Sequence, residues 1–196
     1  MILKQHSDAS YNNKDQARSS YGGYFFLGWK QKDHEPLQLN GALLAEVNVL
    51  KLVAASAAES ELGALFKNMQ RGVILRLKLQ EMGHPQPPTD VWVDNTTTHG
   101  IANSTVKRQR SRAMNMRYFW IIDQVLEKLF RVRWAPGLQN LADYFTKHHP
   151  PWHHCKVRPY YVHMPDSRRC LASALSPSEL QGCADSCNSK WGSTRN

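Results

Sequence analysis

The amino-acid sequence predicts an α/β fold in which a meander of three strands precedes alternating helices and strands. Strand-like segments at 2–8, 22–29 and 42–53 are separated by turns. A capped, amphipathic helix follows from Ser56. Two later apolar strands alternate with helical periodicity, so they must join the same sheet through right-handed crossovers.

The three meander segments differ in polarity. The first, "ILKQHSD", is more polar than a central strand normally is. One of its faces carries Ile2, Lys4, His6 and Asp8. The second, "GGYFFLGW", follows a Ser/Gly turn and is rich in the aromatic residues that favour strands. Asn40 and Gly41 mark the turn into the third segment, which holds enough Leu and Val for a strand.

The helix from Ser56 has the clearest local signal in the chain. Ser56 and Glu59 form a Ser-x-x-Glu capping box, which gives Glu59 a structural role. The apolar stripe that follows consists of Leu62, Leu65, Phe66 and Met69. Glu61 lies beside this stripe and has no such role. A second helix is expected over 71–82, ending at Gly83 before a Pro-rich turn.

The later elements begin with "VWVDNTTTHGIAN" at 91–103, a buried strand followed by Asp94 and a polar stretch. Helical spacing of apolar residues predicts a long helix over 109–129. The alternation in "FRVRW" predicts a half-exposed strand. Asn140 is expected to cap a last helix, "LADYFTK", whose first turn carries Asp143.

Charge favours a polyanionic partner. The 196 residues include 25 Lys and Arg against 16 Asp and Glu, a formal net charge of +9 that attracts nucleic acid at long range. The alternative is a merely soluble basic protein. No apolar run is long enough for a membrane span, and residues 1–20 are too polar for a signal peptide. We therefore expect an intracellular protein with no membrane partner, in the cytoplasm or the nucleus.

The cysteines and histidines gather toward the carboxyl end. All four cysteines lie in the last quarter, which argues against a disulfide scaffold: Cys155, Cys170, Cys183 and Cys187. A zinc site at the last two lacks the usual CxxC spacing and a second pair. For "KHHPPWHHC" we favour an extended segment with a structural or substrate-edge role over zinc binding. The predicted domain is 1–150, with a His/Pro/aromatic extension at 151–164 and a disordered tail at 165–196.

Four carboxylates fall at the end or in the first turn of predicted elements. These are Asp8, Glu61, Asp94 and Asp143. If the strand before Asp94 lies parallel to the first strand, all four are available at one rim of the sheet. Carboxylates gathered there raise each other's pKa unless cations lie among them, and two Mg²⁺ ions about 3.5 to 4 Å apart suit phosphodiester hydrolysis. The alternative is four solvated helix and strand ends.

Several motifs occur in an order that resembles one family. They are "HSDASY", "SAAESELGAL", "VDNTTTHGIAN", "KRQRSRAMNMRYFWIID" and "QNLADYFTKHHPP", spread over residues 1–164. Together they resemble the ribonuclease H domain at the carboxyl end of a copia-type retrotransposon Pol polyprotein. The resemblance implies a five-stranded mixed sheet, an antiparallel meander of three strands plus two parallel strands, flanked by helices.

The resemblance also implies an activity and its residues. Such domains cleave the RNA strand of an RNA/DNA hybrid with two divalent metals, Mg²⁺ or in its place Mn²⁺. The family's four acids match Asp8, Glu61, Asp94 and Asp143. The match to Glu61 agrees with the capping role of Glu59. Asp8 is expected to bridge both ions, with Asp143 at the second. The reverse transcriptase of the same element is an implied partner.

One departure from the family concerns a histidine. Related enzymes carry a His in the loop before the last aspartate, and "WAPGLQN" has none. This predicts slower product release or second-metal turnover, with substitution by His148 as the less favoured alternative. Two other functions stay open: an inactive module that binds nucleic acid or supports a reverse transcriptase, and a DNA-processing integrase or resolvase of the same fold.

A basic stretch near the long helix is expected to hold hybrid phosphates without reading bases. A solvated helix face is the alternative. The candidate nucleic-acid-binding residues are Ser10, Asn95, Thr97, Asn103, Lys107, Arg108, Arg110, Arg112 and Arg117.

Overall fold

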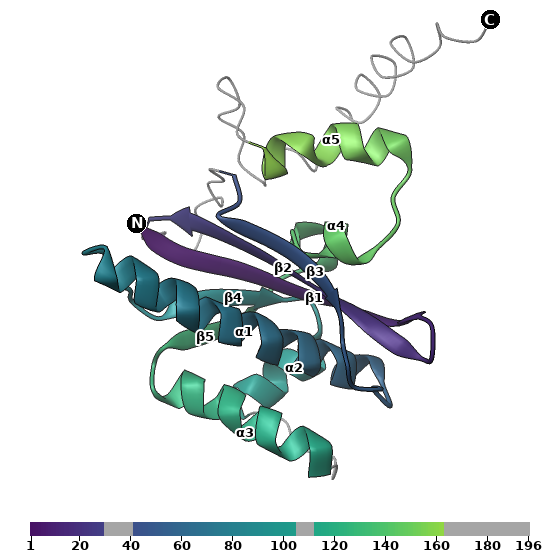
Figure 1. Ribbon diagram of the computed structural model, residues 1–196, viewed down its shortest axis with the longest axis horizontal. Helices are drawn as coiled ribbons and strands as arrows, with labels where there is room; N and C mark the ends of the chain where they lie inside the picture. Colours follow the sequence, from purple (N-terminus) through teal and green to yellow (C-terminus); the bar gives the residue numbers. More distant parts are fainter. Residues whose placement is uncertain (30–40, 105–111, 163–196) are drawn as a thin grey trace, which may run out of the picture.

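The computed structural model describes residues 1–29, 41–104 and 112–162, and it confirms the predicted fold class (Figure 1). A five-stranded mixed sheet has the order β3-β2-β1-β4-β5. Its strands are β1 (Ile2–Lys14), β2 (Arg18–Gly28), β3 (Leu44–Val49), β4 (Thr89–Val93) and β5 (Phe130–Trp134). The first three form the antiparallel meander, whereas β4 pairs parallel with β1 and β5 parallel with β4.

Helices cover both faces of the sheet (Figure 1). One face carries α1 (Ala57–Glu81), α2 (Thr96–Ala102) and α3 (Arg112–Leu126). The other carries the short helices η1 (Gly137–Gln139) and α4 (Asp143–Thr146), followed by α5 (Pro151–Tyr161). The sheet is therefore the middle layer, and the chain crosses from one face to the other after β5.

Helix α1 begins where the capping box predicts and runs further than expected. The Ser56 Oγ accepts a hydrogen bond from the Glu59 N–H at 3.2 Å, and the Glu59 carboxylate accepts one from the Ala55 N–H at 2.7 Å. The predicted division into two helices before residue 71 is wrong, because α1 is continuous to Glu81. Gly72 does not break it. A Cβ there would lie 2.5 Å from the Gln5 side chain, so this glycine allows close packing on the sheet.

Two further helices differ from the expectations. The stretch after Asp94 was not expected to be helical, but it forms α2, capped by the Asn95 side chain, which accepts from the Thr98 N–H at 3.0 Å. The His/Pro segment 147–155 was expected to be extended, and this is wrong from Pro151 onward, where the chain forms α5. Pro150 is the N-cap and Pro151 opens the helix. Proline is tolerated at these positions because the first N–H groups have no partner within the helix.

Side chains of the central strands alternate between two hydrophobic layers. The layer under α1, α2 and α3 includes Leu65, Val91 and Phe130. The opposite layer packs Tyr24 and Phe26 against residues of α4 and α5. In β1, alternation sends Ser7 toward α1 and Asp8 toward α4, because successive side chains of a strand point to opposite faces.

The predicted tail at 165–196 lies outside the described residues, as do Cys170, Cys183 and Cys187. Within the described ranges, no helix combines the length and the apolar character that crossing a membrane requires.

Candidate metal centre

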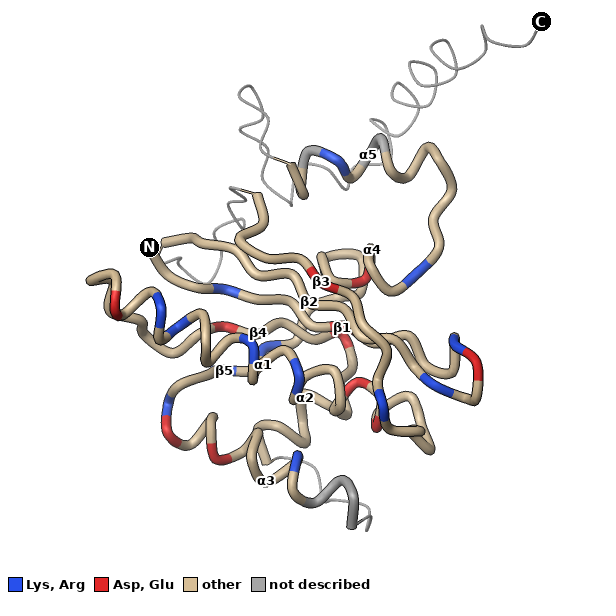
Figure 2. Tube along the Cα trace, viewed as in Figure 1, with Lys and Arg blue, Asp and Glu red and all other residues tan. Residues whose placement is uncertain are grey.

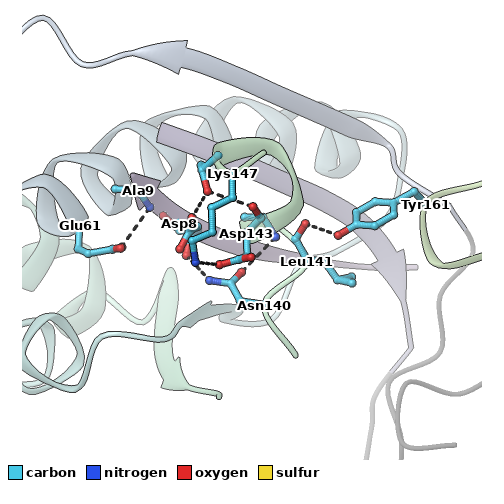
Figure 3. A network of polar contacts seen from close by, with 11 residues as sticks. Asp8, Ala9, Glu61, Asn140, Leu141, Asp143, Lys147 and Tyr161 are labelled. Carbon is cyan, nitrogen blue, oxygen red and sulfur yellow. Dashed lines mark hydrogen bonds and ion pairs between the residues drawn. The ribbon is translucent and has the colours of Figure 1, made fainter. Parts of the chain in front are cut away.

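Three carboxylates from different elements meet at one end of the sheet, and Figure 3 shows two of them, Asp8 and Asp143. Asp8 comes from β1, Asp94 directly follows β4, and Asp143 is the first residue of α4. One oxygen from each lies within 4.8 Å of the others. In the described part of the chain, no other group of three or more His, Cys, Asp or Glu ligand atoms is this close.

Strand direction explains how the first two carboxylates meet. Because β1 and β4 run parallel, with His6 opposite Trp92, Asp8 and Asp94 reach the same rim. The third arrives because Gly22, paired with Asp8 across β1 and β2, leaves room for α4. A Cβ at Gly22 would lie 2.9 Å from Thr146 Cγ2 and 3.0 Å from the Ala142 carbonyl oxygen.

Glu61 reaches the same rim from α1, on the other side of β1. Its Oε1 accepts a hydrogen bond from the Ala9 N–H at 3.2 Å (Figure 3). Its other oxygen, Oε2, is buried and has no hydrogen-bond partner. Glu61 lies outside the group of three carboxylates, but its charge interacts with those of Asp8 and Asp94. The structure thus brings three of the four predicted acids into contact range, with the fourth beside them.

Burial and mutual repulsion raise the free energy of the ionised forms of these carboxylates. Burial, together with the charges of Asp94 and Asp143, raises the pKa of Asp8 to about 7, although a hydrogen bond from Thr146 lowers it. Burial, followed by the charge of Asp8, raises the pKa of Glu61 well above its usual range, and burial also raises the pKa of Asp94. A hard divalent cation removes such a cost and prefers carboxylate oxygens. The donor set and the unpartnered Glu61 oxygen fit such an ion.

Two residues of the α4 turn contact the carboxylates, and the residue patterns did not single them out. The Thr146 hydroxyl donates to Asp8 Oδ2, and the Lys147 ammonium pairs with Asp143 Oδ1. Both follow Asp143 at helical spacing, three and four residues later. That spacing was the available signal, since side chains at these offsets share one helix face.

A set of hydrogen bonds fixes the loop before α4 on β1. The Asn140 Nδ2 donates to the Ser7 carbonyl at 2.9 Å, and the Leu141 N–H donates to His6 Nδ1 at 3.1 Å. Burial lowers the pKa of His6 to about 3, so the imidazole is a neutral acceptor. The prediction that Asn140 is the N-cap is wrong. Ala142 occupies that position, and the Asn140 side chain accepts from its N–H while bridging to β1.

The loop between β5 and α4 passes next to Asp94. A Cβ at Gly137 would lie 3.2 Å from Asp94 Oδ2. The sequence of this loop contains no histidine, and His148 is exposed, beyond the end of α4. Neighbouring histidines have other contacts. His149 stacks on His153 with ring centroids 4.2 Å apart, and His154 Nδ1 lies 2.7 Å from the Tyr144 hydroxyl.

The candidate nucleic-acid-binding residues fall in three groups. Ser10 lies in β1, and Thr97 is exposed in α2. Asn95 and Asn103 have structural roles, since one caps α2 and the other donates to the His99 and Val132 carbonyls. The basic group is only partly described.

In that basic group, Lys107, Arg108 and Arg110 lie outside the described residues, as does the side chain of Arg112. The Arg117 guanidinium lies 5.9 Å from the centre of the Phe66 ring. Among the residues described, Lys and Arg are spread over several elements (Figure 2).

Comparisons with known proteins support the fold and the resemblance. No protein-family model matches the chain. A curated relative is the "Retrovirus-related Pol polyprotein from transposon TNT 1-94" of Nicotiana tabacum, 27% identical over 146 residues, which are 74% of this chain. The matched region is 10% of that polyprotein, so the chain spans about a tenth of its relative.

Solved structures share the fold at low sequence identity. The N-terminal RNase H domain of a Mycobacterium tuberculosis protein is 12% identical, with a TM-score of 0.53 over 74% of this chain and 95% of that one. LC11-RNase H1, solved in complex with an RNA/DNA hybrid, is 11% identical, with a TM-score of 0.52 over 72% and 91%. These findings confirm the resemblance that the motifs predicted: the chain has the ribonuclease H fold and is similar in sequence to a retrotransposon Pol polyprotein, as expected of a ribonuclease H domain from such a polyprotein.

Proposed function

We propose that this chain is a divalent-metal-dependent endonuclease that hydrolyses the RNA strand of RNA/DNA hybrids, leaving a 3′-hydroxyl and a 5′-phosphate. The observation that supports it most is the meeting of Asp8, Asp94 and Asp143 within 4.8 Å, from three separate elements. The sequence similarity to a transposon Pol polyprotein and the hybrid bound by LC11-RNase H1 favour this substrate over DNA alone.

The roles of the four acids follow from their positions. Asp8 lies between Glu61 on one side and Asp143 on the other, so we propose that it contributes to both metal sites. Glu61 and Asp94 would complete one site, and Asp143 the other. Two divalent ions held there, Mg²⁺ or in its place Mn²⁺, supply activation of the attacking water and stabilisation of the leaving oxygen. Burial raises the pKa values of Asp8 and Asp94, and a bound cation would offset the cost of their ionised forms.

Substrate contacts are proposed for the residues around the rim. Ser10 in β1 and Thr97 in α2 would contact the hybrid, and the basic residues before and within α3 would hold phosphates. Residues 1–150 are the proposed catalytic domain, and 151–164 are the proposed extension, of which the described helix α5 packs on that domain. The relative is a much longer polyprotein, which leads us to propose a reverse transcriptase of the same element as a partner.

The test is a cleavage assay on the purified full chain. An RNA/DNA hybrid labelled on either strand is incubated with Mg²⁺, with Mn²⁺ and with EDTA. We expect cuts in the RNA strand that EDTA abolishes and that Asp94→Asn lowers at least about 100-fold, a typical loss when a group stabilising the transition state is removed. Asp123→Asn, an exposed aspartate of α3, is the matched control and should cleave like the wild type.

Other outcomes point to the two alternative functions. Binding of the hybrid without cuts in either strand indicates an inactive nucleic-acid-binding module, which the absence of a histidine from the loop beside Asp94 favours. Cuts in the DNA strand indicate a DNA-processing enzyme of the same fold. Either result contradicts the proposed activity.

A further inference from the structure

Lys147 places a positive charge among the carboxylates of the candidate metal centre. Its ammonium pairs with Asp143 Oδ1 at i,i+4 spacing, and Figure 3 shows the side chain directed toward Asp8 and Asp143. Its charge also stabilises the ionised forms of Asp8, Glu61 and Asp94. One ammonium group therefore acts on all four acids.

This pair differs from an ordinary surface ion pair. The Asp143 side chain is 21% exposed and stands beside Asp8, which is 1% exposed. The Lys78–Glu81 pair of α1, by contrast, has both side chains about two-thirds exposed, at 68% and 65%. Attraction between exposed charges is largely screened by water, whereas a pair at a partly buried cluster keeps more of its strength.

A single ammonium cannot neutralise four carboxylates. Asp8, Asp94 and Asp143 offer ligand oxygens within 4.8 Å of one another, and Glu61 lies beside them, so one ammonium group leaves most of the negative charge of the ionised cluster uncompensated. A divalent ion carries two positive charges and therefore compensates more of the negative charge of the carboxylates than one lysine does. Such an ion would share the Asp143 carboxylate with Lys147, and two cations held at one carboxylate repel each other.

We propose that Lys147 is the built-in counter-cation of the metal-free centre and that a divalent ion displaces it from Asp143 on binding. The inference rests on the metal site of the proposed function and adds that Lys147 competes with the divalent ion for Asp143. The lysine keeps the empty cluster folded and lowers its metal affinity. The measured affinity for the divalent ion then reflects the free energy gained by binding the ion minus the free energy lost by displacing Lys147 from Asp143.

Metal affinity of the full chain, measured without nucleic acid, tests the proposal. Isothermal titration with Mg²⁺ and with Mn²⁺ at low salt compares the wild type with Lys147→Met, Lys147→Arg and Lys78→Met. We expect Lys147→Met to bind about three- to tenfold more tightly, the effect of one partly screened charge. Lys147→Arg keeps the charge and should stay close to the wild type. Lys78→Met removes an ion pair far from the centre and should leave the affinity unchanged.

Thermal unfolding supplies a second readout. In EDTA at pH 8, Lys147→Met should have a lower Tm than the wild type and Lys78→Met, because its carboxylates have lost their counter-charge. In saturating Mg²⁺ this deficit should disappear, since the ion has replaced the lysine.

Two outcomes overturn the proposal in different ways. If the wild type binds Mg²⁺ and Lys147→Met binds it equally or more weakly, Lys147 is not a competitor, and the proposed nuclease is unaffected. If neither protein binds Mg²⁺ or Mn²⁺ at millimolar concentration, the metal site itself fails, and the proposed function falls together with this inference.

Discussion

At the scale of single residues, Asp8 shows how the candidate site costs stability. The side chain is 1% exposed and accepts a hydrogen bond from Thr146. Burial, which the neighbouring carboxylates reinforce, raises its pKa to about 7, whereas an unfolded aspartate titrates near 4. Between these pH values the folded chain binds more protons than the unfolded chain. The stability of the metal-free protein contributed by this group therefore falls as the pH rises from about 4 to about 7, and it stays low above that range.

The substitution Asp8→Asn should remove this penalty. In EDTA at pH 8 we expect the variant to be more stable than the wild type by about 2 to 4 kcal/mol, or on the order of 5 to 10 °C in Tm. The gain should shrink as the pH falls from about 7 and disappear below about pH 4, where Asp8 is protonated in both states. Unfolding followed by circular dichroism at several pH values measures it, with Asp123→Asn as the control. A gain that does not change with pH would refute the electrostatic account.

At the scale of elements, the position of α4 depends on contacts that no helix propensity encodes. The helix has four residues, so it owes its place to the surrounding structure. Gly22 leaves room for its backbone, and Asn140 and His6 hold the preceding loop on β1. From the other side, the Tyr161 hydroxyl donates to the Leu141 carbonyl at 2.7 Å. Asp143 is held by its neighbours on all of these elements.

The substitution Gly22→Ala tests this arrangement. The new methyl group would meet the Ala142 carbonyl oxygen at 3.0 Å, a backbone atom that yields only if α4 moves. We expect roughly 1 to 3 kcal/mol of lost stability from overpacking and a roughly tenfold or greater loss of Mg²⁺ affinity. Gly28→Ala in the same strand is the control, because its Cβ would meet only the Lys4 side chain at 3.4 Å. Equal affinities for both variants would show that Gly22 does not position the centre.

Some features of these elements are predicted by the sequence, and others depend on the tertiary structure. The start of α1 was readable because a capping box is a local signal, and Asp8 and Asp94 were placed at one rim because parallel strands end together. The helix α2 was missed because its Thr-rich sequence has low helix propensity and lacks a long apolar stripe. The contact of Lys147 with Asp143 and the space at Gly22 were not predicted. They depend on how α4 docks, which only the tertiary structure determines.

At the scale of the whole molecule, the candidate centre ties together segments that are distant in the chain. Thr146 and Asp8 are separated by 138 positions, and β4 contributes Asp94 between them. A ligand that binds only the folded arrangement stabilises the entire domain, by about 2.7 kcal/mol at a concentration of 100 times its Kd. Removal of the metal should therefore lower the stability of elements that lie away from the rim as well.

Hydrogen exchange should show this coupling. With Mg²⁺ at 100 times its Kd, we expect amides at 140–147 and in β1 to exchange about 100-fold more slowly than in EDTA if they open by global unfolding. The Asp143→Asn variant is the control and should lose most of this protection. Protection that is confined to the residues around Asp94, with none in β1, would contradict a centre shared by the three elements.

The separation between Asp8 and Thr146 has a further consequence during synthesis on the ribosome. At about 5 to 20 residues per second, roughly 7 to 30 s pass between the translation of these two positions. Late in that interval the nascent polypeptide contains the residues of the meander, α1 and β4 but still lacks Asp143. The group of three carboxylates is therefore completed only after the segments that form the meander, α1 and β4 have been synthesised.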